Sequence, residues 1–321
     1  MDFEDAVRSA MLGLVAGDAL GVPVEFMSRE ELERDPVIGM RSQGTHRQPS
    51  GTWSDDSSMA LCLLESLTEK GVDYGDMMAR FLRWADEGYM TARGEVFDMG
   101  IATRRALTRF THGTSPSECG GSGEYDNGNG SLMRILPMAL YLHRTMGPDF
   151  PQRPEAYPII HNASALTHAH PVSLISCGIY CAAANELLCG RTGIWDGIKT
   201  AKSYYHSQTE FKPYQGIFKR IDGGVLPSLH KSEIRSSGYV VHTLEASLWC
   251  MEQNHSFRSC LLEAVNLGED TDTVGAVAGG LAGLRYGWSE IPSDWLAVIA
   301  KRERIERLCA MFSAKVCVEA K

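Results

Sequence analysis

Two short acidic motifs are the residue patterns in this sequence that most directly suggest chemistry. Residues 54–57 read SDDS and residues 269–273 read EDTDT, and each motif stands directly before an apolar segment with helical spacing. Ser and Asp are preferred helix N-caps, and acidic groups in a first turn suit the helix dipole. Capping therefore explains either motif when it is taken singly.

The number of carboxylates in the two motifs goes beyond what capping needs. A cap uses one side-chain acceptor, whereas each motif holds at least two neighbouring carboxylates. Two ionised carboxylates about 4 Å apart repel by about 4 kcal/mol at an effective dielectric constant near 20, and a divalent cation would reverse that sign. Oxygen ligands from Asp, Ser and Thr favour Mg²⁺ or Mn²⁺ over zinc. Asp56 and Asp270 are 214 positions apart (270 minus 56), so spacing permits a two-metal site that only the fold can create.

A glycine-rich stretch and a histidine pair could contribute to a binding site. Residues 127–131 read NGNGS, and glycines there would let the backbone and a helix start approach a phosphate, although an ordinary turn with a Ser cap is the simpler interpretation. His168 and His170 are two apart and cannot share one helix face, so they do not form a helical zinc pair. A structural role is the default for either histidine.

An aromatic residue and an acid near the amino terminus also have two interpretations each. Tyr239 follows Gly238 at the start of an amphipathic segment, where it could stack on a base or pack against the core. Glu25 ends a largely apolar stretch, residues 17–26, where an acid is either functional or simply solvated.

The bulk composition excludes several classes of protein. The net charge of −9 (31 basic minus 40 acidic residues) argues against nucleic acid or an anionic membrane as the main partner. The first five residues, MDFED, lack the basic and apolar order of a signal peptide, and residues 172–188 are short for a membrane span. The nine cysteines are scattered, which predicts reduced thiols and a cytoplasmic location.

Helical periodicity dominates the elements that must position these residues. Apolar residues recur at three- and four-residue spacing in residues 6–14, 59–67 and 244–251. Further predicted helices cover residues 75–87, 98–110, 131–145, 172–189, 257–266, 273–286 and 303–314, with Pro137 expected to kink the third of these. Alternating β-branched runs are almost absent, so the sequence predicts an all-α bundle in a single domain, residues 1–321. Residues 28–52, 113–130, 147–154 and 207–237 are the predicted loops.

Taken together, the motifs resemble those of the ADP-ribosylglycohydrolase family, especially its dinitrogenase-reductase-activating branch. The matching motifs, in the family's order, are Gly17-Asp18-Ala19-Leu20-Gly21 with Glu25, Ser54-Asp55-Asp56, Phe97-Asp98-Met99-Gly100, Gly128-Asn129-Gly130-Ser131-Leu132-Met133-Arg134, Thr167-His168, Gly238-Tyr239 and Asp270-Thr271-Asp272-Thr273. Each motif is weak alone, and jointly they are very specific.

The resemblance implies an orthogonal α-helical bundle with two Mg²⁺ or Mn²⁺ ions between helix ends. It implies metal ligands at Ser54, Asp55, Asp56, Asp270, Asp272 and Thr273, with Asp55 also counted as catalytic. Asn129, Gly130, Ser131 and His168 would hold the diphosphate or ribose, and Tyr239 would stack on adenine. Asp98 falls where an acid faces the guanidinium in the arginine-directed branch, and Glu25 where a mobile acidic loop approaches the metals.

The reaction that the resemblance implies is hydrolysis of the N-glycosidic bond of an ADP-ribosylated protein, with ADP-ribose as product. Such cleavage passes through an oxocarbenium-like state that metal-bound hydroxyls and a carboxylate stabilise, and Asp98 is the candidate to hold or deliver the leaving group's proton. The protein substrate, ADP-ribose and an ADP-ribosyltransferase are the expected partners, without nucleic acid or membrane.

Several positions depart from the family's pattern. Ser54 and Ser57 stand where Thr is usual, Glu269 where Gly is frequent and His242 where an acid is common. Loop 113–127 is long for this branch. None of these changes removes a predicted ligand.

Two other function classes remain open from the sequence. A metal-dependent phosphoester hydrolase would use similar acids and a similar glycine loop, but it would have no need of Asp98. A non-catalytic immunity or binding relative could keep the fold, although intact ligand residues argue against it. A hydrolase of an O-linked or small-molecule ADP-ribose conjugate is a third alternative within the same chemistry.

Overall fold

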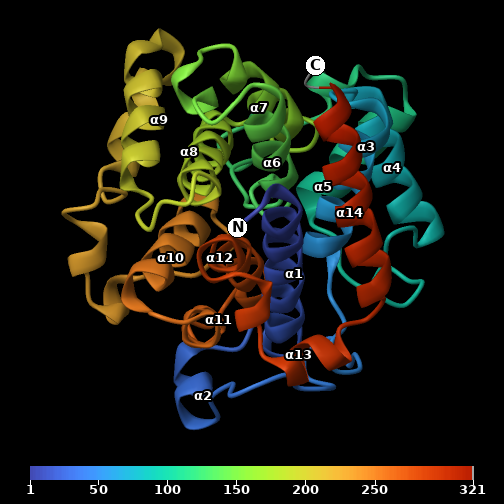
Figure 1. Ribbon diagram of the computed structural model, residues 1–321, viewed down its shortest axis with the longest axis vertical. Helices are drawn as coiled ribbons and strands as arrows, with labels where there is room; N and C mark the ends of the chain where they lie inside the picture. Colours follow the sequence, from blue (N-terminus) through green and yellow to red (C-terminus); the bar gives the residue numbers. More distant parts are fainter. Residues whose placement is uncertain (320–321) are drawn as a thin grey trace.

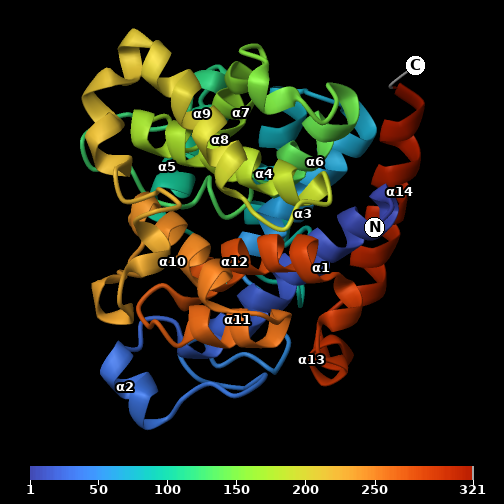
Figure 2. The same cartoon turned by 60° about the vertical axis from the view of Figure 1, so that its left-hand side comes forward.

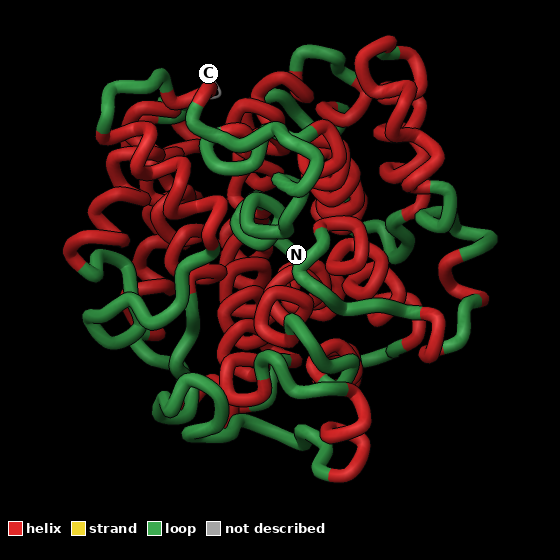
Figure 3. The backbone as a smooth tube through the Cα atoms, turned by 180° about the vertical axis from the view of Figure 1, so that it is seen from behind, coloured by secondary structure: helices red, strands yellow, loops and turns green. Residues whose placement is uncertain are grey.

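The protein is built from helices alone. The computed structural model describes residues 1–319, with side chains to residue 316. Within that range it has fourteen α-helices, short 3-10 turns and three isolated β-bridges, but no β-sheet (Figures 1 and 3). The α-helices are α1 (Phe3–Gly21), α2 (Arg29–Arg34), α3 (Asp55–Lys70), α4 (Tyr74–Glu87), α5 (Ile101–Thr111), α6 (Leu136–Thr145), α7 (Ala156–Ala165), α8 (Pro171–Leu188), α9 (Trp195–Ser207), α10 (Val240–Gln253), α11 (Phe257–Val265), α12 (Thr271–Tyr286), α13 (Ser293–Val298) and α14 (Arg302–Glu319). The predicted all-α class is confirmed.

Helix α6 departs from its predicted form. It begins at Leu136, five residues after the predicted start, and Pro137 occupies its first turn. A first-turn residue has no intrahelical partner for its N–H, so proline is tolerated there and helps to start the helix. The predicted kink at Pro137 is therefore wrong. Helices α7 and α9 and the short α2 and α13 were not predicted at all.

Helices α1 and α12 form the centre of the molecule, and they lie side by side in both ribbon views (Figures 1 and 2). Their backbones are in contact because glycines face each other. A β-carbon added at Gly17 would lie 1.9 Å from the carbonyl oxygen of Gly275, and one added at Gly13 would lie 2.2 Å from that of Gly279. At the end of this seam, a β-carbon on Gly21 would lie 2.4 Å from the Cα of Asp272. The seam thus holds the acidic start of α12 against the end of α1.

Two segments are long and apolar enough to span a membrane by length and composition. They are Phe3–Val24, which contains α1, and Pro171–Leu188, which is α8. In the structure, 94% and 83% of the residues in their most apolar windows are buried inside the protein. Core helices pass the same test, and α1 and α8 are core helices of this protein.

Candidate active site

The start of α3 is held by an acid from α1. Asp18 accepts hydrogen bonds from the backbone N–H groups of Ser54 (2.9 and 3.0 Å to its two oxygens) and Ser57 (3.0 Å), and from the hydroxyl of Ser57 (2.5 Å). Ser54 is the N-cap and accepts from the Asp56 N–H at 3.4 Å. These two side chains satisfy the helix start, so capping does not account for the carboxylates of Asp55 and Asp56. The sequence alone assigns no role to Asp18.

At the start of α12, too, capping does not explain the first carboxylate, which is that of Asp270. Asp270 occupies the N-cap position but makes no side-chain capping bond. Its Oδ2 instead accepts a hydrogen bond from the Asn129 side chain at 2.8 Å. Asp272 accepts from the Thr273 N–H, also at 2.8 Å.

The two acidic motifs meet in the fold. The Thr273 hydroxyl donates to Asp56 Oδ2 at 3.4 Å, although the two residues are 217 positions apart. Burial, followed by the charge of neighbouring carboxylates, raises the pKa of Asp55, Asp56 and Asp272 well above the usual range. The convergence that spacing only permitted is present in the structure.

The donor set fits a divalent cation. Asp56 Oδ1 is buried and has no hydrogen-bond partner, which is costly for a carboxylate oxygen unless another ligand satisfies it. Glu25, Asp270 and Asp272 each offer one oxygen, and these atoms lie within 4.8 Å of one another. All the predicted donors are hard oxygen atoms, the chemistry that suits Mg²⁺ or Mn²⁺. The identity and number of the ions stay predictions.

A cavity of about 310 Å³ opens beside this cluster. Most of the predicted site residues line it. They are Glu25, Asp55, Asp56, Asp98, Asn129, Gly130, His168, Asp270 and Thr273. Ser54, Ser131, Tyr239 and Asp272 are not among the lining residues.

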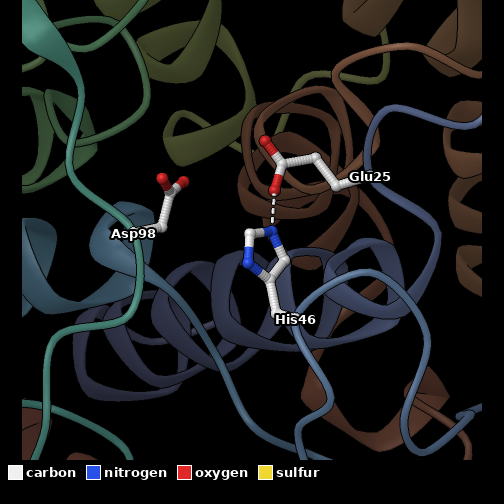
Figure 4. A group of neighbouring side chains, drawn as sticks. All are labelled: Glu25, His46 and Asp98. Carbon is white, nitrogen blue, oxygen red and sulfur yellow. Dashed lines mark hydrogen bonds and ion pairs between the residues drawn. The ribbon is translucent and has the colours of Figure 1, made fainter.

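Glu25 and Asp98 both line the cavity, and Figure 4 shows that they come from different segments of the chain. Glu25 is 5% exposed, and burial raises its pKa to about 7. Asp98 lies before α5, whose N-cap is Gly100, so capping of that helix does not explain this acid. The charge of Asp98 is one of the causes that raise the pKa of Glu25 and of Asp55. The Asp98 carboxylate therefore lies close enough to interact electrostatically with both.

His46 is a site residue that the sequence reasoning missed. Its Nε2 is hydrogen-bonded to Glu25 Oε2, and the two side chains point toward each other in Figure 4. The His46 ring lies 5.1 Å from the ring of Phe97, centroid to centroid. The hydrogen bond to Glu25 raises the pKa of His46. A single histidine in a predicted loop carries no motif, so nothing in the sequence connected position 46 with position 25.

The glycine-rich loop packs closely on His168. A β-carbon added at Gly130 would lie 2.7 Å from His168 Cε1, so only glycine fits there. The His168 Nδ1 is hydrogen-bonded to the Thr167 hydroxyl at 2.7 Å. Burial, with the nearby Arg134 cation, lowers the pKa of His168 to about 3, so the imidazole is neutral at pH 7. A neutral ring can offer one nitrogen to a ligand as donor or acceptor.

Two predicted substrate residues lie behind or beside the cavity. Ser131 is buried, and its Oγ accepts a hydrogen bond from the Ser164 hydroxyl at 2.8 Å. Tyr239 is half-buried and lines a second cavity, of about 510 Å³, together with His242. A β-bridge between Gly128 and Tyr239 joins this second cavity to the glycine-rich loop. The substrate roles of Ser131 and Tyr239 stay predictions.

Glu269 adopts a conformation that explains why glycine is frequent at its position. Its φ is +61°, in the left-handed region that favours glycine. Its carbonyl accepts from the Phe26 N–H at 2.7 Å, and its own N–H donates to the Met27 carbonyl at 2.7 Å. This pair of hydrogen bonds ties the segment that carries Glu25 to the start of α12.

Comparison with known proteins agrees with this geometry. A family model described as ADP-ribosylglycohydrolase matches residues 1–320. An ADP-ribosylarginine hydrolase, Tri1, from Serratia proteamaculans is 33% identical over 95% of this chain and 78% of that protein. An ADP-ribosyl-[dinitrogen reductase] glycohydrolase from Rhodospirillum rubrum is 33% identical over 91% of this chain and 90% of that protein.

A solved structure leads to the same family. An ADP-ribosylglycohydrolase-related protein complex contains a chain that superposes with a TM-score of 0.78 at 31% identity, covering 100% of this chain and 99% of that one. The helical architecture is thus shared over the whole length. This chain belongs to the ADP-ribosylglycohydrolase family and is an enzyme of that family.

Proposed function

We propose that this enzyme hydrolyses the N-glycosidic bond between ADP-ribose and an arginine side chain of a protein, with two Mg²⁺ or Mn²⁺ ions, and so reverses mono-ADP-ribosylation. The observation that carries the proposal is the meeting of two acidic helix starts in one cavity with Asp98. The name of the Serratia relative, an ADP-ribosylarginine hydrolase, supports the arginine linkage.

The residues present suit a dinuclear site. Ser54, Asp55, Asp56, Asp270, Asp272 and Thr273 would hold the ions, and the unpartnered Oδ1 of Asp56 supports this assignment. Bound divalent ions would polarise substrate oxygens and activate water. Asn129, Gly130, Ser131 and His168 would hold the diphosphate or ribose, and Tyr239 would stack on adenine.

Asp98 would pair with the positive charge of the guanidinium, and Glu25 would take part in proton transfer at the scissile bond. A planar guanidinium pairs with a carboxylate, and Asp98 lies in the cavity to provide it. Water adds to the ribose carbon, and the leaving guanidine nitrogen takes up a proton. Glu25 lines the same cavity as Asp98 and would hold or release a proton there. The surrounding carboxylates would stabilise positive charge that develops on the sugar ring.

The cellular setting is part of the proposal. The eight cysteines whose side chains the structure describes are all unpaired, which supports a reducing, cytoplasmic compartment. The proposed functional partner is an ADP-ribosyltransferase, whose modification of the substrate protein this enzyme would remove.

The test is incubation with a protein ADP-ribosylated on arginine, with and without Mg²⁺ or Mn²⁺. We expect free ADP-ribose only when the metal is present. Release of AMP would show cleavage of the diphosphate linkage by a phosphohydrolase instead, and release of ADP-ribose only from serine-linked substrate would assign the O-linked alternative. Binding without any product would favour a non-catalytic relative.

A further inference from the structure

Three strongly exposed apolar side chains surround the mouth of the active-site cavity. Phe26 is 68% exposed, Ile101 is 71% exposed and Tyr125 is 89% exposed, and all three border that cavity. They come from separate segments, namely the turn after Glu25, the first position of α5 and the loop of residues 113–130. Among the nine large apolar residues that are exposed in the described chain, three thus gather at one opening.

Phe26 is held in this exposed position against its conformational preference. Its φ is +66°, a region that bulky residues rarely occupy and that is worth on the order of 1–3 kcal/mol of strain. Its N–H donates to the Glu269 carbonyl at 2.7 Å, which fixes the turn. The Phe26 ring lies 6.1 Å from the His46 ring, but the side chain is still 68% exposed, so an external contact is the better explanation of its open surface.

The diphosphate and the ribose hydroxyls of ADP-ribose suit the polar residues deeper in the cavity. Its adenine base is assigned above to Tyr239, which lines the second cavity. Apolar side chains at the mouth would meet whatever surrounds the modified residue of the substrate. Exposed apolar clusters rimmed by polar groups are typical of protein-binding surfaces.

We propose that Phe26, Ile101 and Tyr125 form a docking rim for the polypeptide surface around the ADP-ribosylated residue. The occupant is an apolar surface of the substrate protein, because the rim is continuous with the cavity that takes the modified side chain. The rim selects protein-linked ADP-ribose over free ADP-ribosyl-arginine. This inference rests on the proposed function.

The experiment compares two substrates that share the scissile bond and differ in the polypeptide. Ile101→Ser and Tyr125→Ser are assayed with ADP-ribosyl-arginine protein and with free ADP-ribosyl-arginine. Phe26 is left unchanged because its ring lies 6.1 Å from the ring of His46, which is hydrogen-bonded to Glu25. We expect kcat/KM for the protein substrate to fall about tenfold per variant, or about 1.4 kcal/mol, with the free conjugate unaffected.

Ile38→Ser is the matched control, since Ile38 is 70% exposed and lies away from the cavity lining. This variant should hydrolyse both substrates at the parent rate. Equal losses on both substrates in the rim variants, or no loss on either, would overturn the docking rim.

Binding measurements separate this inference from the proposed function. Calorimetry with the ADP-ribosylated protein and with free ADP-ribose should show the same selective loss in the rim variants. If binding depends on the rim but the parent releases no ADP-ribose, the proposed function fails and the docking rim stands. If the parent releases ADP-ribose but the rim variants bind the ADP-ribosylated protein as tightly as the parent does, the proposed function stands and the docking rim fails.

Discussion

At the scale of single residues, His46 is the side chain that positions Glu25. Its hydrogen bond holds one carboxylate oxygen of Glu25, and the rings of Phe26 and Phe97 lie 6.1 and 5.1 Å from its own ring. We expect His46→Ala to lower kcat roughly tenfold or more with little change in KM, because partners that orient a reacting group are typically worth 10- to 100-fold. His46→Gln, which can still donate, should recover part of the rate. Steady-state kinetics on ADP-ribosyl-arginine measures both, and equal rates for Ala, Gln and parent would refute the positioning role.

Under the proposed function, Asp98 carries the specificity for arginine. Because Gly100 is the N-cap of α5, Asp98→Asn should leave the free energy of unfolding unchanged. Asn keeps the shape but loses the charge that pairs with guanidinium, so hydrolysis of ADP-ribosyl-arginine should fall roughly 10- to 100-fold, since hydrogen bonds to charged groups are worth about 1.5–3 kcal/mol. Affinity for free ADP-ribose should persist in calorimetry. A variant that turns over at the parent rate would remove the main support for the arginine linkage.

The residues that the sequence predicted and those it missed differ in kind. Asp56 and Asp270 stand in motifs with several adjacent oxygens, so their chemistry was visible in the sequence. His46 and Asp18 act through partners far along the chain, at positions 25 and 54–57, and such pairings exist only in the fold. The sequence also could not decide which residues cap the two helices. In the structure the Ser54 side chain caps α3, whereas the Asp270 side chain makes no capping bond to α12.

At the scale of elements, the glycine seam between α1 and α12 places the two acidic helix starts. Gly17→Ala should lower the free energy of unfolding by about 1–3 kcal/mol or more, because the new β-carbon would lie 1.9 Å from the Gly275 carbonyl oxygen. Gly193→Ala is the control, since a β-carbon there meets no atom within 4 Å. Urea unfolding compares the two. Similar urea midpoints for both variants would mean that α1 and α12 can move apart at this seam without a loss of stability.

The elements were predictable where their periodicity was strong. The central helices α1, α3, α10 and α12 carry regular apolar spacing and were found, whereas α7 and α9 were not. Helix α9 is rich in aromatic and polar residues, which form a cluster in which Tyr157 and Tyr204 stack at 3.7 Å between ring centroids. Tertiary packing of that kind stabilises a helix without leaving a clear local pattern. The predicted kink at Pro137 was wrong because the effect of a proline depends on its position in the helix. Pro137 lies in the first turn of α6, where proline is tolerated, and not in the helix interior, where it would cause a kink.

At the scale of the whole molecule, the fold concentrates carboxylates at its centre in a chain that already carries a net charge of −9. Asp18, Glu25, Asp55, Asp56, Asp270 and Asp272 all have pKa values raised chiefly by burial. Without a cation, burial makes each of these groups harder to ionise than a free carboxylate. Their ionised forms are the ones that bind metal, so metal binding, folding and pH are linked.

The sign of that link gives a prediction for the metal-free protein. The pKa of Glu25 rises from 4.5 in the unfolded chain to about 7 in the folded one, so the folded state holds a proton that the unfolded state releases. Stability is then greatest below about pH 4.5 for this group and is lost as pH rises toward 7, by about 3 kcal/mol at about 1.4 kcal/mol for each tenfold change in proton affinity. Asp18, with a pKa raised to about 6, acts in the same direction.

Urea unfolding in a chelator, at pH 5.5 and pH 8.0, measures this effect directly. We expect the metal-free protein to be less stable at the higher pH, and Glu25→Gln to flatten the difference because one titrating group is gone. Excess Mg²⁺ or Mn²⁺ should reverse the trend, since the ions bind the deprotonated carboxylates and release protons that a weakly buffered solution can report. If chelated protein is equally stable at both pH values and neither ion changes its unfolding, the acidic centre is a structural network rather than a metal site.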